Sequence, residues 1–286
     1  AAPTPTGSVT VDGGKLDDLI FAIVGDTRPM TVDDTASYPT LIITRIFQAL
    51  EAASPRPFFA VTTGDYMFAS NGGGQAGPQL DKYVTARESF TNPVFPAMGN
   101  HECTGYTDSN CGPGALDGTT NQFLAYQQRF LAPLGLANPW YAVRVDDKNG
   151  AWSAKFVFVA ANAWNAEQAT WLDQALADPT TYTFVVRHEP GSASTAPGVT
   201  PSANIITNHP ITLVIEGHTH TYYHSGTTRE LVVGNGGAPI TSSVNYGYVM
   251  AHRRPADGAI VFEEHDYDTG TITDTFAINA DGSAAP

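Results

Sequence analysis

Two imidazole side chains, His218 and His220, are separated by a single residue. They follow an apolar run at residues 211–215, which is typical of a buried strand, and Gly217, which lets the backbone turn sharply. Imidazole is a common metal ligand, and ligands of open α/β sheets bind beyond the carboxyl ends of strands. The pair alone is weak support for a metal site, because two ordinary loop histidines would fit it equally well.

Four other expected strands also end in side chains that can bind a metal ion. The strands are apolar runs at residues 19–24, 58–63, 93–98 and 182–187, and the side chains that follow them are Asp26, Asp65, Asn100 with His101, and His188. These oxygen and nitrogen ligands suit Zn, Mn or Fe, and the set offers no thiolate. Two ions that share one carboxylate would need about this many ligands, and such a pair clamps the oxygens of a phosphoryl group.

The order and spacing of these motifs resemble the calcineurin-like metallophosphoesterase superfamily. The matching motifs lie between residues 19 and 220 and are Gly25-Asp26, Gly64-Asp65, Gly99-Asn100-His101-Glu102, His188 and Gly217-His218-Thr219-His220. Residues 217–224 and 232–237 look most like the purple acid phosphatase branch. The resemblance implies an α/β fold, a four-layer α/β/β/α sandwich of two mixed β-sheets flanked by helices.

The resemblance also implies two metal ions per chain, with Fe, Mn and Zn as candidates. It assigns Asp26 and His220 to the first ion, Asn100, His188 and His218 to the second, and Asp65 to both. A hydroxide bound to the two metals would attack phosphorus. His101 would lie outside the metal shell, orient the phosphate and protonate the leaving alkoxide. The alternative for His101 is a structural hydrogen bond beside Asn100.

Two positions depart from the family pattern. Arg28 stands where most members carry a histidine, and Phe68 stands where purple acid phosphatases carry a metal-binding tyrosinate. Tyr66 is one residue past Asp65, and the sequence does not show whether it reaches a metal. The first ion is therefore one protein ligand short. Either water or substrate fills the gap, or the first site is weak, or Arg28 holds the phosphate with its planar guanidinium.

We expect open coordination at the first ion together with a contact between Arg28 and the phosphate. The alternative pairs Arg28 with Asp33 or Asp34. Without a tyrosinate, we expect no purple colour. The motifs together favour a metal-dependent phosphoester hydrolase that acts on a small phosphomonoester. The alternatives are a phosphodiesterase of the same family, and a non-catalytic metal- or phosphate-binding protein whose first metal site is degraded.

The chain is acidic, with a formal net charge of −14 over 286 residues and a pI of about 4.7. Such a charge gives no electrostatic footprint for nucleic acid or an anionic membrane, so neither is an expected partner. No apolar run approaches the roughly 18 residues of a membrane helix. An anionic substrate would bind only where metal ions or a placed arginine reverse the local field. The sequence leaves the oligomeric state open.

The two cysteines, Cys103 and Cys111, flank a segment of small and polar residues that is typical of a loop. A disulfide is the favoured interpretation, and it would contribute roughly 2.5 kcal/mol in the chain-entropy model. The alternatives are free thiols or soft metal ligands. A disulfide would fit an oxidising compartment. Residues 1–8 look like the start of a chain after signal-peptide removal, so a secreted or periplasmic protein is expected.

We expect one domain over residues 16–279, with tails at 1–15 and 280–286 that add little to the core. Helical spacing or composition predicts helices at residues 39–53, 80–90, 121–130 and 167–177. A loop rich in Ser, Ala, Pro and Gly at 191–203 is typical of a mobile segment near an opening. Short strands between residues 231 and 278 would complete the sheets.

Overall fold

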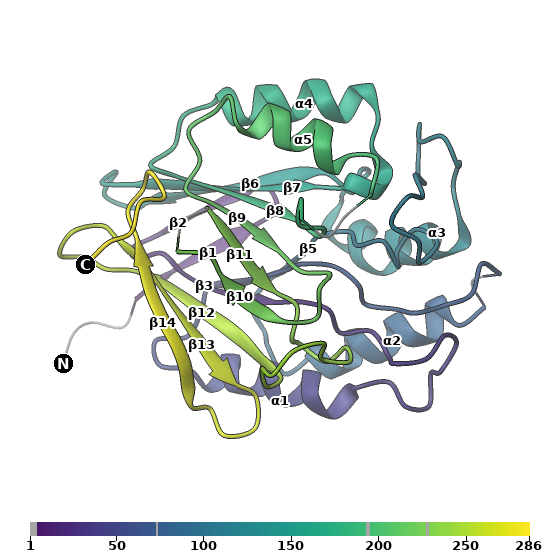
Figure 1. The fold of residues 1–286 in the computed structure, drawn as a ribbon. Coiled ribbons are helices and arrows are strands. Elements are labelled where there is room, and N and C mark those ends of the chain that lie inside the picture. Colours follow the sequence, from purple (N-terminus) through teal and green to yellow (C-terminus); the bar gives the residue numbers. More distant parts are fainter. Residues whose placement is uncertain (1–4, 73, 193–194, 227–228) are drawn as a thin grey trace.

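Two β-sheets lie face to face, and helices cover their outer sides (Figure 1). The computed structural model describes residues 5–72, 74–192, 195–226 and 229–286. Helices α4 (Ala166–Ala177) and α5 (Val199–Ile206) cover one sheet. Helices α1 (Thr40–Ala52) and α2 (Ala76–Arg87) cover the other. The expected four-layer α/β/β/α sandwich is therefore confirmed.

The eight-stranded sheet is mixed. Its strands, in spatial order, are β1 (Gly7–Thr10), β2 (Gly13–Leu16), β6 (Tyr141–Asp147), β7 (Ser153–Val159), β8 (Tyr182–Arg187), β9 (Leu213–Glu216), β11 (Glu230–Val233) and β10 (Tyr222–His224). The central run from β7 through β8 and β9 to β11 is parallel. Parallel strands are buried on both faces, which explains the unbroken apolar runs of their sequences.

The six-stranded sheet combines a parallel half with an antiparallel half. Its order is β14 (Ile272–Ile278), β13 (Ile260–Asp266), β12 (Gly247–Arg253), β3 (Ile20–Val24), β4 (Phe59–Thr62) and β5 (Val94–Pro96). Strands β3, β4 and β5 run parallel, whereas β12 pairs with β3 in the opposite direction. The carboxyl ends of the three parallel strands consequently meet at one edge.

Aromatic side chains fill the space between the two sheets. Phe21 on β3 meets Phe156 on β7 edge to face, with ring centroids 4.9 Å apart, and it also contacts Phe184 on β8. All three rings are fully buried. Such aromatic pairs add roughly 0.5–1.5 kcal/mol each beyond the area that they bury. This packing fixes the two sheets relative to each other, and with them the strand ends that carry the site.

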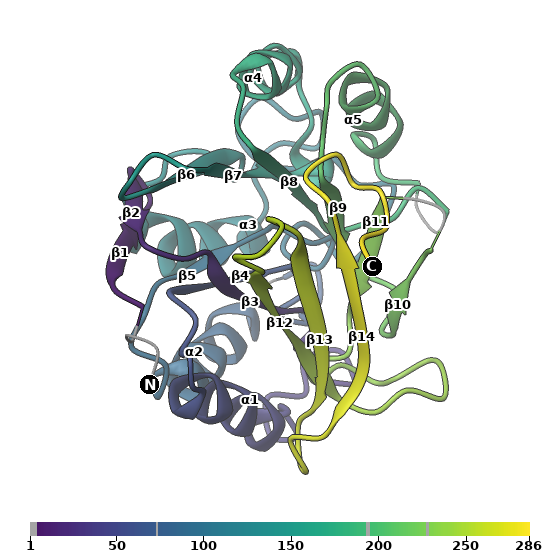
Figure 2. The same ribbon diagram turned by 90° about the vertical axis from the view of Figure 1, so that its left-hand side faces the viewer.

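The expected amino-terminal tail is largely a hairpin. Within residues 1–15, strands β1 and β2 pair and extend the eight-stranded sheet beside β6 (Figure 2). Residues 1–4 lie outside the described part of the chain. Leu16 at the end of β2 is fully buried and belongs to the inter-sheet core. These short strands are rich in glycine and lack an apolar pattern that would predict them. They pair with the sheet through β6, which lies far along the chain.

Other elements also differ from their expected positions. Helix α5 begins at Val199, inside the segment expected to be a mobile loop, of which residues 193 and 194 lie outside the described part. Helix α2 begins at Ala76 rather than residue 80. The expected helix at 121–130 is α3 (Asn121–Tyr126) followed by a π-helical turn (Gln127–Leu131). The expected tail at 280–286 folds back so that Ala284 bridges to Ile278.

No helix among the described residues has the length and hydropathy that crossing a lipid bilayer would require. The longest, α1, is a surface helix. It buries one face, with Ile43, Ile46, Phe47 and Leu50 against the six-stranded sheet, whereas Leu41 on the same helix is exposed.

Candidate metal centre

The side chains with metal-binding chemistry all follow the carboxyl ends of parallel strands. Asp26 follows β3, Asp65 follows β4, Asn100 follows β5, His188 follows β8, and His218 with His220 follows β9. The two sheets therefore bring residues from five separate stretches of sequence to one edge of the sandwich. This is the place where α/β folds bind their ligands.

Four of these residues adopt a backbone conformation that is uncommon for residues other than glycine. The φ angles are 53° at Asp26, 58° at Asp65, 69° at His218 and 49° at His220. Each such residue costs of the order of 1–3 kcal/mol and persists only where surrounding contacts hold it. Asp26 is held by its own N–H, which donates to Gly64 O at 3.2 Å, and by Ala238 N–H, which donates to Asp26 O at 2.7 Å.

Close approach of the backbone explains the glycine that precedes the two histidines. The His218 N–H donates to both carboxylate oxygens of Asp26, at 3.1 and 2.9 Å. A Cβ at Gly217 would collide with Asp26 Oδ2 and with the Thr63 side chain. Glycine at this position therefore allows the loop after β9 to bring His218 and His220 against Asp26.

Two overlapping groups of side chains have the geometry of a metal site. Asp26, Asp65 and His220 form the first group, and Asp65, His188 and His218 form the second. The ligand atoms of each group lie within 4.8 Å of one another. The Asn100 Oδ1 joins the second group, since it lies 3.1 Å from both His188 Nε2 and His218 Nδ1. All six residues expected to bind metal thus come together, and Asp65 belongs to both groups.

Hydrogen bonds to backbone carbonyls orient two of the imidazole rings. His188 Nδ1 lies 2.8 Å from Thr63 O, and His220 Nδ1 lies 2.9 Å from Pro239 O. A carbonyl oxygen only accepts, so Nδ1 carries the hydrogen in both rings. In the neutral rings, Nε2 then presents its lone pair toward the carboxylates. This is the arrangement by which proteins hold metal-binding histidines, so the residues present fit a metal ion.

Burial and neighbouring charges shift the pKa values of several members of the cluster. Burial raises the pKa of Asp26 well above its usual range, and the negative charge of Asp65 adds to this. Burial disfavours a charged His188, but the adjacent Asp65 and Asp26 outweigh it and raise its pKa to about 10. Burial lowers the pKa of His218 to about 4. Burial opposes ionisation of Asp65, but the neighbouring His188 and His101 hold its pKa well below its usual range. The metal-free cluster therefore holds protons on Asp26 and His188, and a metal ion would displace them.

Glu102 supports the backbone of the site, a role that was not predicted from the sequence. Its carboxylate is fully buried and accepts three backbone N–H groups, from Asp65 at 2.9 Å, Tyr66 at 2.9 Å and Gly99 at 2.8 Å. Burial and the nearby Asp65 charge raise its pKa to about 7. Glu102 thereby ties the loop after β4 to the loop after β5. The sequence did hold one indication of this role, because Glu102 directly follows Asn100 and His101 in the same turn.

His101 lies beside the shared carboxylate. Its N–H donates to Asp65 Oδ1 at 3.1 Å, and its Nε2 lies 3.7 Å from Asp65 Oδ2. Burial lowers the pKa of His101 to about 3, so the ring is neutral near pH 7. Its Nδ1 has no hydrogen-bond partner among the described residues.

Arg28 also lies at Asp65, with its Nε 3.9 Å from Oδ2. Its Nη1 donates to Pro29 O at 2.9 Å. The alternative partners Asp33 and Asp34 use their carboxylates elsewhere, where they accept the N–H groups of Ser70 and Ser37. The position of Arg28 thus adds positive charge beside the shared carboxylate.

Tyr66 points away from the site. Its hydroxyl bonds to Thr62 Oγ1 at 2.6 Å and donates to Ala97 O at 2.9 Å, inside the core. Phe68 instead faces the site and contacts both Arg28 and His101. The first ligand group consequently receives no tyrosine oxygen from either position.

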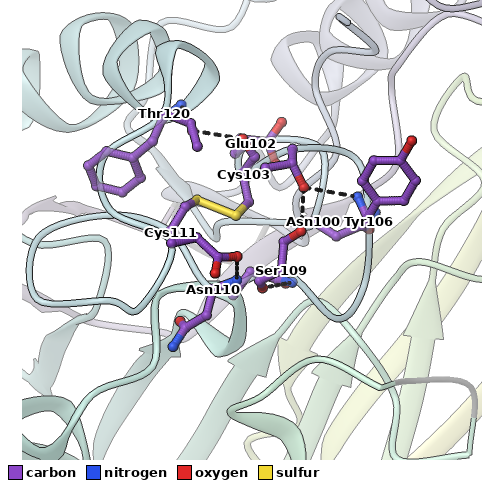
Figure 3. The surroundings of a disulfide bond; sticks show 12 residues. Asn100, Glu102, Cys103, Tyr106, Ser109, Asn110, Cys111 and Thr120 are labelled. Carbon is purple, nitrogen blue, oxygen red and sulfur yellow. Dashed lines mark hydrogen bonds between the residues drawn. A yellow bond between two sulfur atoms is a disulfide. The ribbon is translucent and has the colours of Figure 1, made fainter. Parts of the chain in front are cut away.

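A cavity of about 650 Å³ opens over the cluster. Residues that line it include Arg28, Asp65, His101, His218, His220 and Ile240. The favoured disulfide is present between Cys103 and Cys111 (Figure 3). Both half-cystines are fully buried, and neither belongs to the two metal-binding groups.

Solved structures are similar to this chain at low sequence identity, and the first one below shares its fold. A purple acid phosphatase from yellow lupin (Lupinus luteus) seeds matches with a TM-score of 0.65 and 18% identity, over 94% of this chain and 55% of that one. A putative 5′-nucleotidase from Staphylococcus aureus matches with a TM-score of 0.46 and 13% identity, over 92% and 54%. Vacuolar protein sorting 29 from Cryptosporidium parvum matches with a TM-score of 0.44 and 11% identity, over 92% and 98%.

The chain spans about half the length of the lupin phosphatase. No curated protein matches the sequence significantly. The family profile described as calcineurin-like phosphoesterase matches residues 21–222, a span that contains all six candidate ligands. The protein therefore belongs to the calcineurin-like phosphoesterase family.

Proposed function

We propose that the protein is a metal-dependent phosphoester hydrolase that acts on small phosphomonoesters through a dinuclear centre. The shared position of Asp65 carries this proposal. Its carboxylate belongs to both ligand groups, one with Asp26 and His220 and one with His188 and His218. One bridging carboxylate between two sets of nitrogen and oxygen ligands is the arrangement of a two-metal hydrolase.

A bound pair of ions would supply the nucleophilic water and neutralise charge on the phosphoryl oxygens. The chain supplies the remaining positive charge. Arg28 lines the cavity with its Nε 3.9 Å from Asp65 Oδ2, where the guanidinium would contact a phosphoryl oxygen. A protein of net charge −14 repels anions overall, so this local cation matters for substrate binding.

His101 would orient the substrate and protonate the leaving oxygen. The ring is neutral in the free protein, because burial lowers its pKa to about 3. A phosphate dianion beside the ring would raise this pKa, since a neighbouring negative charge favours imidazolium. The proton would then be held at Nε2, which lies 3.7 Å from Asp65 Oδ2. The donor would therefore form only with substrate in place.

A monoester is favoured over a diester by charge. A monoester dianion carries one more negative charge than a diester, and Arg28 supplies a cation in addition to the metal pair. The guanidinium fork suits the terminal oxygens that a monoester exposes.

The test compares hydrolysis of an aryl phosphate with that of a bis-aryl phosphate after loading with Mn, Zn or Fe. Asp65→Ala should abolish turnover, whereas Asp12→Ala removes an exposed carboxylate and should leave it unchanged. Faster turnover of the bis-aryl substrate would assign a phosphodiesterase. Tight metal binding without turnover for any metal would assign a binding protein.

We also propose that the protein functions in an oxidising compartment, secreted or periplasmic. The buried Cys103–Cys111 disulfide supports this proposal, because such bonds persist where thiols are oxidised. The check is mass spectrometry with thiol labelling on protein isolated in the presence of a trapping reagent. Two labelled cysteines in freshly isolated protein would contradict the proposal.

A further inference from the structure

The side-chain amide of Asn100 is oriented by a single backbone carbonyl. Asn100 Nδ2 donates to Gly105 O at 3.0 Å. Because a carbonyl accepts but does not donate, the amide nitrogen must face Gly105, and Oδ1 must face the opposite way. There it lies 3.1 Å from His188 Nε2 and from His218 Nδ1. The position of Gly105 thus determines whether Asn100 offers oxygen to the second ligand group.

Gly105 belongs to a loop that is held by hydrogen bonds, such as the one from Thr104 Oγ1 to Ser109 Oγ at 2.6 Å, rather than by buried side chains. Residues 104–109 contain no buried side chain, and Tyr106 at the tip is 63% exposed. Gly105 itself has a φ of 88°, and a Cβ there would lie 3.4 Å from His101 Nδ1. Hydrophobic burial therefore does not hold this loop over Asn100 and His101.

The far side of the loop is attached to the other sheet. Asn162 lies in a 3₁₀ turn, Ala161–Ala163, that follows β7. Its Nδ2 donates to Thr107 O at 3.1 Å and to Ser109 O at 3.2 Å. The Cys111 N–H donates to Asn162 O at 2.8 Å. The end of the loop near Cys111 is consequently fixed to the eight-stranded sheet. The other end follows Asn100 and therefore β5 of the six-stranded sheet.

The disulfide joins Cys103 and Cys111, which lie at the two ends of the loop (Figure 3). Cys103 lies in the turn that starts at Asn100, where the N–H groups of Cys103 and Gly105 both donate to Asn100 O, at 3.1 and 2.9 Å. Cys111 lies at the Asn162 anchor. With the bridge closed, Gly105 has little freedom to move away from the Asn100 amide.

We propose that the Cys103–Cys111 disulfide is a positioning element for the second metal site, in addition to stabilising the fold. It holds the Gly105 carbonyl against the Asn100 amide, and this contact directs Oδ1 into the ligand group of Asp65, His188 and His218. The inference rests on the proposed dinuclear function. The disulfide would act on the ion of the second ligand group, because Asn100 Oδ1 lies 3.1 Å from both His188 Nε2 and His218 Nδ1.

The test is calorimetric titration of metal-free protein with Mn²⁺ or Zn²⁺. The wild-type protein should bind two ions. The Cys103→Ala/Cys111→Ala variant should bind one ion with unchanged affinity and the other on the order of tenfold or more weakly, as is typical when a partner that orients a ligand is lost. Gly105→Ala keeps the disulfide but strains a residue at positive φ, and it should weaken the binding of the same ion.

A core variant separates positioning from general destabilisation. Val249→Ala removes volume from the inter-sheet core and should lower the thermal midpoint without changing either metal affinity. If the double cysteine variant binds both ions as tightly as wild type, the bridge only stabilises the fold and the inference is wrong. If the wild-type protein itself fails to bind two ions, the dinuclear proposal fails instead, which is a different result in the same titration.

Discussion

The guanidinium of Arg28 lies over the ring of Phe68, with Cζ 4.6 Å from the ring centroid. The same ring meets His101 at an interplanar angle of 75°, with centroids 4.6 Å apart. Gln79 fixes the backbone of Phe68, since it accepts the Phe68 N–H at 2.6 Å and donates to its carbonyl at 3.2 Å. One aromatic side chain thus holds the two groups proposed to contact phosphate.

Replacing Phe68 with leucine should weaken phosphate binding. A cation–π contact of about 1 kcal/mol corresponds to roughly a fivefold effect, so KM and the inhibition constant of inorganic phosphate should rise about that much. Metal stoichiometry should stay the same. Phe68→Trp keeps an aromatic face without adding a phenol oxygen that could bind metal, and it serves as the control. An unchanged inhibition constant in Phe68→Leu would show that the ring does not position Arg28.

Replacing Asp65 with asparagine should disrupt both metal sites at once. The change should lower turnover by more than about a hundredfold, because losing a direct ligand exceeds the loss of an orienting partner. In wild type, a chelator should lower the thermal midpoint, since a ligand bound only to the folded state stabilises it. The midpoint of Asp65→Asn should not respond to the chelator. Two ions retained by Asp65→Asn would contradict the bridging role.

Replacing Glu102 with alanine should destabilise the fold as well as the site. Three buried N–H groups, of Asp65, Tyr66 and Gly99, would lose their acceptor. Each unsatisfied buried donor costs about 1–3 kcal/mol, so a loss of at least about 3 kcal/mol is expected in urea unfolding. Glu88→Ala removes an exposed carboxylate and is the matched control. Equal unfolding free energies in the two variants would rule out this role.

Glu264 should make stability fall as pH rises. Burial raises its pKa to about 7 from an ordinary value of 4.5, although Asn235 Nδ2 donates to it at 3.0 Å. The folded state therefore holds the proton more tightly than the unfolded state. This contribution is complete below about pH 4.5 and is lost as pH rises toward 7.

The pH effect can be isolated with a neutral side chain of the same shape. Glu264→Gln should reduce the loss of unfolding free energy between pH 4.5 and 7, measured in urea at several pH values. Glu263→Gln changes the adjacent residue, which faces the other side of the sheet, and should leave the wild-type dependence intact. Parallel curves for wild type and Glu264→Gln would exclude Glu264 as the source.

The sequence by itself determined which strand ends carry the chemistry. Parallel strands buried on both faces read as apolar runs, and the ligands Asp26 and Asp65 follow such runs directly, so their approximate placement needs no contact information. The buried face of α1 is equally local, because a period of 3.6 residues selects it.

Only the tertiary structure decided how those side chains point. That Tyr66 faces the core while Phe68 faces Arg28 depends on partners on other strands, as does the orientation of the His188 ring by Thr63. The hairpin β1–β2 likewise forms against β6, far along the chain. A side chain's direction is set by the contacts that surround it, and residues distant in sequence make most of those contacts here.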